Sequence, residues 1–169
     1  MSRTLALGMI GALTGIGLCA QNAKADVPMA VAVEAAQTAV AACKANGYNV
    51  AATIMDADLS TRVVLRGDGA PDGTVEFGRR KAYTVIKTGM SSGEFGKTAP
   101  APASPPASGP PLLPGAVAGD PNLISWAGGV AIKAGGKIIG ALSVAGAPDG
   151  DKDEACANEG LGKIAGKLK

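Results

Sequence analysis

The chain has 169 residues, in which 16 Lys and Arg side chains stand against 14 Asp and Glu, and it contains no histidine. This balance argues against a nucleic-acid-binding protein, which neutralises phosphates with a basic surface. The absence of histidine excludes Ser-His-Asp and Cys-His catalysis, His-based zinc sites and the usual axial ligand of haem iron.

Residues 1–25 have the three parts of a secretory signal peptide. Arg3 gives a short positive start, residues 5–20 are apolar, and an Ala-x-Ala site ends the segment. We therefore predict cleavage and a periplasmic or secreted mature chain, residues 26–169, with no stable membrane span. A retained anchor or a lipoprotein is the alternative, although a leucine precedes Cys19, the one possible lipid attachment site of a lipoprotein signal.

The mature chain is expected to fold as a single domain whose core is built mainly from small aliphatic side chains. Cleavage removes Arg3 and Lys24 and no acidic residue, which leaves 14 basic and 14 acidic side chains. Aromatic residues make up 3% of the sequence, so each core side chain buries little area. A disulfide and assembly would each add stability to such a domain, and we expect a homo-oligomer.

Residues 30–46 are dominated by good helix formers and are predicted to form the first helix, which has Cys43 near its end. Cys156 lies near the start of the last predicted helix. If the two helices pack antiparallel, these ends meet and the cysteines form a disulfide worth on the order of 4 kcal/mol. Two separate buried thiols remain the alternative.

Two strands and a second helix follow. Residues 50–55 and 61–66 are β-prone and separated by a turn, which predicts a hairpin. Thr74 is predicted to begin a helix that runs to about Thr88. Within this helix, residues 79–81 form a short basic cluster, which we interpret as a solvated helix face.

A proline-rich loop is predicted over residues 97–124, because eight of the eleven prolines lie between Pro100 and Pro121. Proline removes backbone donors and fixes φ, so a regular helix or a central strand is excluded here. A loop of this length is expected to be functional or mobile. We favour a lid or a subunit contact over a recognition segment for a proline-binding partner.

The last part of the chain predicts a hairpin and a helix. Residues 130–133 and 137–144 flank a Gly-Gly turn, and residues 151–168 begin with a capping pattern. No crossover between parallel strands is evident. The predicted fold class is therefore α+β, an antiparallel β-sheet flanked by helices in the order α-β-β-α-loop-β-β-α.

The residues give no visible catalytic machinery. The two separated cysteines lack a C-x-x-C motif, and the glycine clusters lack the context of a nucleotide-binding fingerprint. Asp149, Asp151, Asp153 and Glu154 suggest calcium superficially, but capping of the last helix explains them better. An enzyme is thus less favoured than a binding protein.

Three segments, in this order, carry a resemblance to a known family: Ile54–Asp58 with Val63–Ala70, Lys81–Thr84, and Gly128–Gly146 with Asp153–Gly160. They resemble the GlcG/HbpS family of haem-binding or haem-degrading proteins. The resemblance implies a compact antiparallel sheet flanked by helices, assembly into dimers or larger rings, and haem as the ligand, with a corrinoid as the alternative.

The resemblance also implies site residues. Lys81 and Tyr83 are the leading candidates for an iron ligand, although weak or water ligation stays open. Arg66 and Arg80 are candidates to pair with the haem propionates. The alternatives are surface charge for Lys81 and Arg80, a core-edge position for Tyr83 and a strand-end charge for Arg66.

Three functions are compatible with these observations. The first is an exported haem-binding protein for sensing, scavenging or protection. The second is an enzyme that degrades or modifies haem or another small molecule by chemistry on the bound cofactor. The third is an oligomeric protein that binds a partner through its proline-rich loop.

Overall fold

The computed structural model describes residues 26–99, 115–117 and 119–168. The predicted signal peptide and most of the proline-rich loop lie outside the described residues. The helices are α1 Met29–Ala45, α2 Thr74–Thr88, α3 Ser92–Thr98 and α4 Gly150–Ile164, which continues as a 3-10 turn, Ala165–Lys167. The strands are β1 Ala51–Asp56, β2 Thr61–Arg66, β3 Ala116–Val117, β4 Asp120–Ile124, β5 Gly129–Ala134 and β6 Lys137–Ala145.

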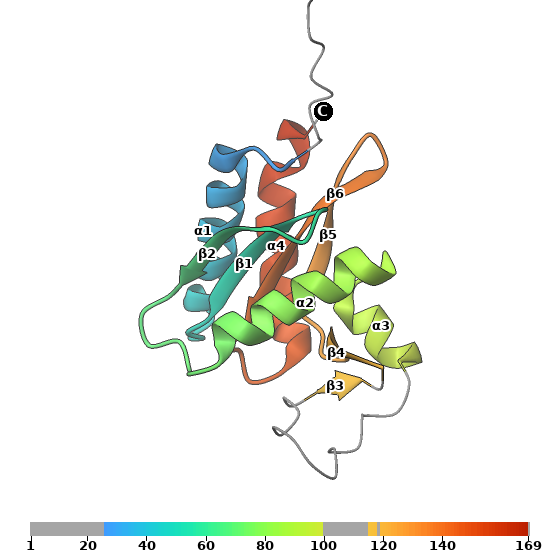
Figure 1. Cartoon of the computed structure of the whole chain (residues 1–169). Helices are drawn as coiled ribbons and strands as arrows, with labels where there is room; N and C mark the ends of the chain where they lie inside the picture. Colours follow the sequence, from blue (N-terminus) through green and yellow to red (C-terminus); the bar gives the residue numbers. More distant parts are fainter. Residues whose placement is uncertain (1–25, 100–114, 118, 169) are drawn as a thin grey trace, which may run out of the picture.

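The main sheet has four antiparallel strands in the order β2-β1-β6-β5. Helices α1 and α4 lie side by side on one face, and α2 crosses the other face (Figure 1). The predicted α+β class, with an antiparallel sheet and flanking helices, is confirmed. Among the described residues, no helix combines the length and apolar character needed to cross a bilayer.

The layer formed by α1 and α4 is apolar and tightly packed. Alanines line the buried side of α1, and on α4 a Cβ added at Gly160 would lie 2.6 Å from the carbonyl oxygen of Ala35. This close approach brings Cys43 and Cys156 together as the predicted disulfide. Small side chains thus allow α1 and α4 to pack closely, and the disulfide links the two helices covalently.

The layer formed by α2 is more polar. Thr53, Ser143, Arg80 and Lys81 are all buried between this helix and the sheet or its neighbours. The Ser143 hydroxyl donates to the carbonyl oxygen of Gly78 at 2.7 Å. A Cβ at Gly78 would lie 2.8 Å from Thr53 Oγ1, so glycine permits the helix to lie close to β1. Polar contacts therefore position α2.

The structure corrects the expected loop over residues 97–124. Helix α3 occupies residues up to Thr98 and begins with a capping box between Ser91 and Glu94, a signal present in the sequence. At the other end, β3 and β4 form a two-stranded sheet that includes Pro121. Within the described residues β4 pairs with β3 alone, and an edge strand of this kind tolerates proline.

Candidate functional site

A cleft of about 450 Å³ opens where the start of α2 meets the connection from β6 to α4. We call it the aromatic cleft. It is lined by Pro71, Asp72, Thr74, Phe77, Lys81, Trp126, Ala145, Gly146, Ala147, Pro148, Asp149, Gly150 and Asp153. Segments that are distant in sequence form it, because α2 and α4 start at the same end of the sheet.

Phe77 and Trp126 form the aromatic wall of the cleft. Phe77 lies in the first turns of α2, and Trp126 follows β4. Their ring centroids are 5.2 Å apart with an interplanar angle of 46°. Trp126 is 42% exposed, so the wall offers ring surface to a ligand rather than to the core.

Lys81 and Asp153 form the floor of the cleft. Lys81 Nζ lies 2.7 Å from Asp153 Oδ2 and donates to the carbonyl oxygen of Val144 at 2.9 Å. The other carboxylate oxygen of Asp153 accepts the backbone N–H of Ala147 at 2.9 Å. These bonds tie α2, the end of β6 and α4 together beneath the aromatic wall.

Burial shifts the proton affinities of both floor residues. The two side chains are 3% and 5% exposed. Desolvation lowers the pKa of the Lys81 ammonium and raises the pKa of the Asp153 carboxyl, and the attraction within the pair opposes each effect without cancelling it. The site therefore favours the neutral forms of both groups more than water does.

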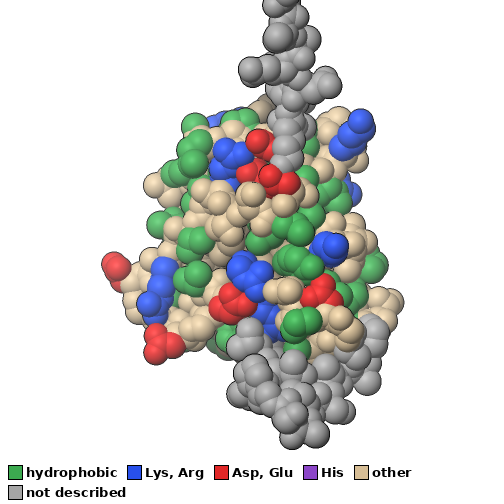
Figure 2. Space-filling view, in the orientation of Figure 1, with side chains coloured by type: hydrophobic (Ala, Val, Ile, Leu, Met, Phe, Trp, Pro, Cys, Tyr) green, Lys and Arg blue, Asp and Glu red, His purple; other side chains and the backbone are tan. Residues whose placement is uncertain are grey.

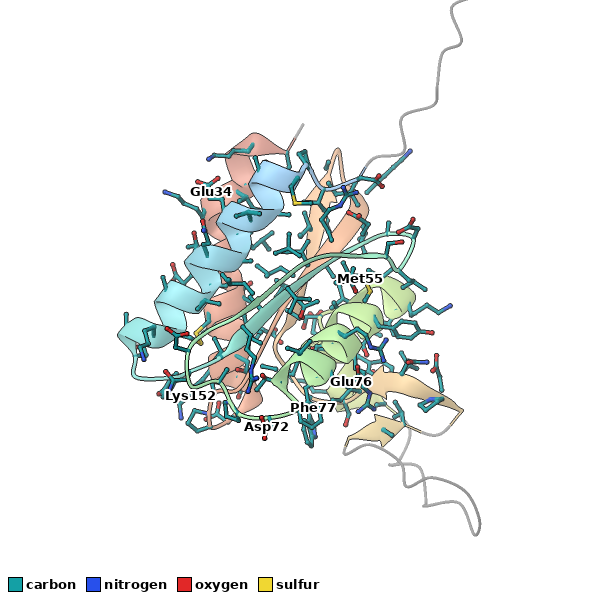
Figure 3. All side chains as sticks on the ribbon, turned by 60° about the vertical axis from the view of Figure 1, so that its left-hand side comes forward. Glu34, Met55, Asp72, Glu76, Phe77 and Lys152 are labelled. Carbon is teal, nitrogen blue, oxygen red and sulfur yellow. A yellow bond between two sulfur atoms is a disulfide. The ribbon has the colours of Figure 1, made fainter. Side chains whose placement is uncertain are left out.

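Two ion pairs flank the rim. Arg66 lies 3.2 Å from Asp72, and Lys152 lies 2.7 Å from Asp149, which also caps the start of α4. Figure 3 shows Asp72, Phe77 and Lys152 at the same end of the molecule. On the face shown in Figure 2, basic and acidic side chains are interspersed. The rim therefore has cations that are already held by carboxylates.

The four predicted cofactor-binding residues do not converge on one point. Lys81 lies on the floor, and Arg66 reaches the rim through Asp72. Arg80 is fully buried and donates to the carbonyl oxygen of Leu123, whereas the Tyr83 hydroxyl donates to Asp120 at 2.9 Å. Of the four predicted residues, only Lys81 lines the cleft; Arg66 is linked to it through Asp72, and Arg80 and Tyr83 lie at the contact between α2 and β4.

The interpretation of residues 79–81 as a solvated helix face is wrong for two of the three. Arg80 and Lys81 are 0% and 2% exposed, so surface charge does not describe either. Arg79 alone remains at the surface side, paired with Glu76 at 2.7 Å. The reason is helical geometry, since consecutive residues point about 100° apart and three in a row cannot share one face.

Phe77, Trp126 and Asp153 line the cleft but are not among the site residues that the sequence predicts. The capping interpretation holds for Asp149, whereas the side chain of Asp153 turns inward to Lys81. The scarcity of aromatics was the signal available for Phe77 and Trp126. In the described part of the chain, no group of three or more acidic or cysteine side chains is placed to hold a metal ion.

The structure is a small α+β domain with a cleft at one end of its sheet, and comparison with known proteins identifies its family. The model of the HbpS-like haem degrading protein family matches residues 27–162. The chain belongs to this family, as the resemblance predicted. A comparison with curated proteins gave no significant match.

Solved structures agree with this assignment. A crystal structure of HbpS is 32% identical, with a TM-score of 0.70 over 82% of this chain and 90% of that one. A double mutant of Streptomyces reticuli HbpS is 26% identical, with a TM-score of 0.67 over 95% and 99% of the two chains. A PduOC–haem complex shares the fold at 20% identity, with a TM-score of 0.67 over 82% and 95%.

Proposed function

We propose that the protein binds haem in the aromatic cleft and works outside the cytoplasm. Haem is proposed as the ligand because the chain belongs to the HbpS-like haem degrading family over residues 27–162 and is 32% identical to HbpS. The PduOC structure, a complex with haem, supports the proposal at the level of a shared fold. The aromatic wall and the charged rim of the cleft suit the apolar ring and the propionates of haem.

The aromatic wall fits the flat, apolar ring of a tetrapyrrole. Phe77 and Trp126 present ring surface beside Pro71 and Pro148, and the cleft volume of about 450 Å³ lies in the range of small-molecule sites. Ring faces and proline edges contact a planar ligand over a large area without hydrogen bonds. The macrocycle would therefore bind with its apolar part against this wall.

The rim fits the propionates. Arg66 and Lys152 stand at the cleft through their pairs with Asp72 and Asp149. A propionate can replace a rim carboxylate as the partner of either cation, and the arginine fork favours a bidentate bond. Because the floor amine of Lys81 is already held by two acceptors, the proposal assigns the iron to weak or water ligation.

A hemin titration of residues 26–169, followed in the Soret region, tests haem binding. We expect saturation at a fixed haem-per-chain ratio and an affinity weakened about two- to tenfold in Phe77→Leu and in Trp126→Leu, since an aromatic contact contributes about 0.5–1.5 kcal/mol. Phe95→Leu, an aromatic substitution in α3 outside the cleft, is the matched control. Tyr83→Phe tests the iron ligand implied by the family resemblance.

A titration without saturation would remove haem from the proposal, and the same experiment with a corrinoid would then test the alternative ligand. Degradation is the second candidate, favoured by the description of the family. Bound haem is exposed to ascorbate and oxygen for this test. Loss of the Soret band with release of iron would assign degradation, whereas a stable band would assign binding alone.

Export is proposed from the signal-like segment of residues 1–25, and the disulfide between Cys43 and Cys156 supports an oxidising compartment. The test is N-terminal sequencing of the protein recovered from the periplasmic and culture fractions. A chain that begins at Asp26 supports export with cleavage at the expected site. A full-length chain that stays in the cytoplasm contradicts it.

A further inference from the structure

The disulfide that links α1 and α4 lies one helical turn from the aromatic cleft. Cys156 follows Asp153 of the cleft floor by three positions on α4, and side chains at this spacing are neighbours on the helix surface. A Cβ at Gly150, the first residue of α4, would lie 2.9 Å from the carbonyl oxygen of Ala127, which follows Trp126. The start of α4 therefore positions both the floor and the wall of the cleft.

A second connection runs from the disulfide to the rim of the cleft. The carbonyl oxygen of Cys43 accepts the backbone N–H of Tyr48 at 3.0 Å, which holds the turn after α1. Lys152 Nζ lies 5.8 Å from the centroid of the Tyr48 ring and 2.7 Å from Asp149 Oδ2. The bridge thus positions Tyr48, and Tyr48 in turn contacts the rim cation through a cation–π interaction.

The contact between α1 and α4 relies on the bridge because its side chains are small. The buried residues of α1 are four alanines and Cys43. Each alanine buries little apolar area, so the covalent link restrains the first turns of α4 more than these side chains do. When the link opens, we expect these turns to move relative to α2, and the floor pair of Lys81 and Asp153 joins exactly these two helices.

One sulfur atom of the bridge borders a cavity that a small reagent can enter. We call it the sulfur cavity, and it is lined by Ala42, Asn46, Tyr48, Lys152, Ala155, Cys156 and Glu159. Its volume of about 220 Å³ is far above the about 10–15 Å³ that one water needs. Cys156 is 4% exposed and Cys43 is 0% exposed, so a thiol reaches Cys156 first. The cation of Lys152 favours the reactive thiolate form of such a reagent.

We propose, on the basis of the haem site proposed above, that the disulfide is a thiol-sensitive switch: the oxidised bridge holds the aromatic cleft in its haem-binding shape, and reduction by a small thiol lowers the affinity for haem. The thiolate of the reagent attacks Cys156 Sγ, the S–S bond breaks, and Cys43 leaves as a thiolate that takes up a proton. A second thiolate attacks the reagent's sulfur in the mixed disulfide and releases Cys156, which is also protonated. Two external thiols are thereby oxidised to one disulfide, and the bridge is reduced to two thiols.

Fluorescence and hydrogen exchange test the switch without haem. Trp126 is the one tryptophan of the chain and lines the cleft, so its emission reports the cleft wall directly. We expect reduction of residues 26–169 with dithiothreitol to shift this emission. Hydrogen exchange at residues 150–156 should accelerate while exchange in β6 stays slow, because the opening is local. Far-ultraviolet circular dichroism shows whether the fold persists.

Hemin titrations of the oxidised and the reduced chain measure the effect on affinity. Dithiothreitol is removed without oxygen before hemin is added, because thiolates are themselves ligands of haem iron. Coupling between two sites typically amounts to about 5–150-fold, so we expect the reduced chain to bind hemin at least about fivefold more weakly. Cys43→Ala with Cys156→Ala should bind as weakly as the reduced chain and should not respond to dithiothreitol.

A substitution in the sulfur cavity tests the route of the reagent. Ala155 is an exposed residue that lines this cavity, so Ala155→Leu narrows the approach to Cys156. We expect it to slow reduction by at least about threefold, since the rate of thiol exchange depends on access, and to leave the hemin affinity of the oxidised chain unchanged. Asn158→Leu, at an exposed position of α4 outside the cavity, is the matched control.

Equal hemin affinity of the oxidised and reduced chains overturns the proposal, and reduction of Ala155→Leu at the rate of the control overturns the route. If the oxidised chain does not bind hemin, the haem site is refuted instead. Trp126 emission and hydrogen exchange then decide by themselves whether the bridge controls the cleft. If the reduced chain loses its dichroism, the comparison is repeated in trimethylamine oxide, which favours folded states. A chain that stays unfolded there also overturns the proposal, because the bridge would then hold the whole domain and not the cleft.

Discussion

The disulfide between Cys43 and Cys156 should supply much of the stability of this domain, and its reduction is the most direct perturbation of the fold. The two cysteines are 113 residues apart in sequence and lie on α1 and α4. A bridge that closes a loop of this size removes about 5 kcal/mol of conformational freedom from the unfolded chain. Most domains have only about 5–15 kcal/mol of total stability.

The measurement is equilibrium unfolding in urea, with and without a reducing agent that is present throughout refolding and unfolding. For a urea dependence of about 2 kcal/mol per molar, a loss of about 5 kcal/mol lowers the midpoint by about 2–3 M. We also expect a steeper dependence in the reduced chain, because its unfolded state exposes more surface.

Reduction of the natural chain isolates the cross-link, since both sulfur atoms remain in the core. The variant Cys43→Ala with Cys156→Ala is the comparison, and it should lose somewhat more because removal of the sulfur atoms adds small cavities. A midpoint that changes by less than the equivalent of about 1 kcal/mol would refute the reasoning. It would mean that the unfolded chain is not constrained by this bridge.

Two further predictions concern close packing and a hydrogen bond of α2. Gly160→Ala would place Cβ 2.6 Å from the carbonyl oxygen of Ala35, so we expect a loss of about 1–3 kcal/mol in urea unfolding. The control Gly162→Ala, with nothing within 4 Å, should gain up to about 1 kcal/mol. The hydrogen bond to Asp120 raises the pKa of Tyr83 above 10.0, so its contribution to stability is present below that pH and is lost as the pH rises through the folded-state pKa. Tyrosinate absorbance should show this late titration, and its persistence in Asp120→Asn would contradict the assignment.

Much of the fold could be predicted because local signals agree with the tertiary structure. The hairpin of β5 and β6 turns at Gly135 and Gly136, which both have positive φ, as a tight turn requires. The sequence also contains a signal for the start of helix α3, the capping box formed by Ser91 and Glu94. The sheet of β3 and β4 was not predicted, because the prolines around it weighed against any strand.

The candidate site could be predicted only in part, because its contacts join distant segments. Lys81 and Asp153 are 72 positions apart, and a pattern of charges along the chain gives no hint that they meet. Spacing could nevertheless have warned that residues 79–81 do not all face solvent, since three consecutive helical residues cover about 200° of the helix surface. The convergence of Phe77 and Trp126 depends on the path after β4, which no local pattern specifies.

The two faces of the sheet have different physical roles, and this difference explains where the site lies. On the face of α1 and α4, small apolar side chains and a disulfide pack the core of the domain. On the face of α2, buried polar groups such as Lys81 and Ser143 need specific partners. Because α2 is held by a few hydrogen bonds and an ion pair, a cleft can form at its end without disrupting the apolar core. The apolar face can therefore maintain the fold while the end of α2 forms one wall of the cleft in which we propose that haem binds.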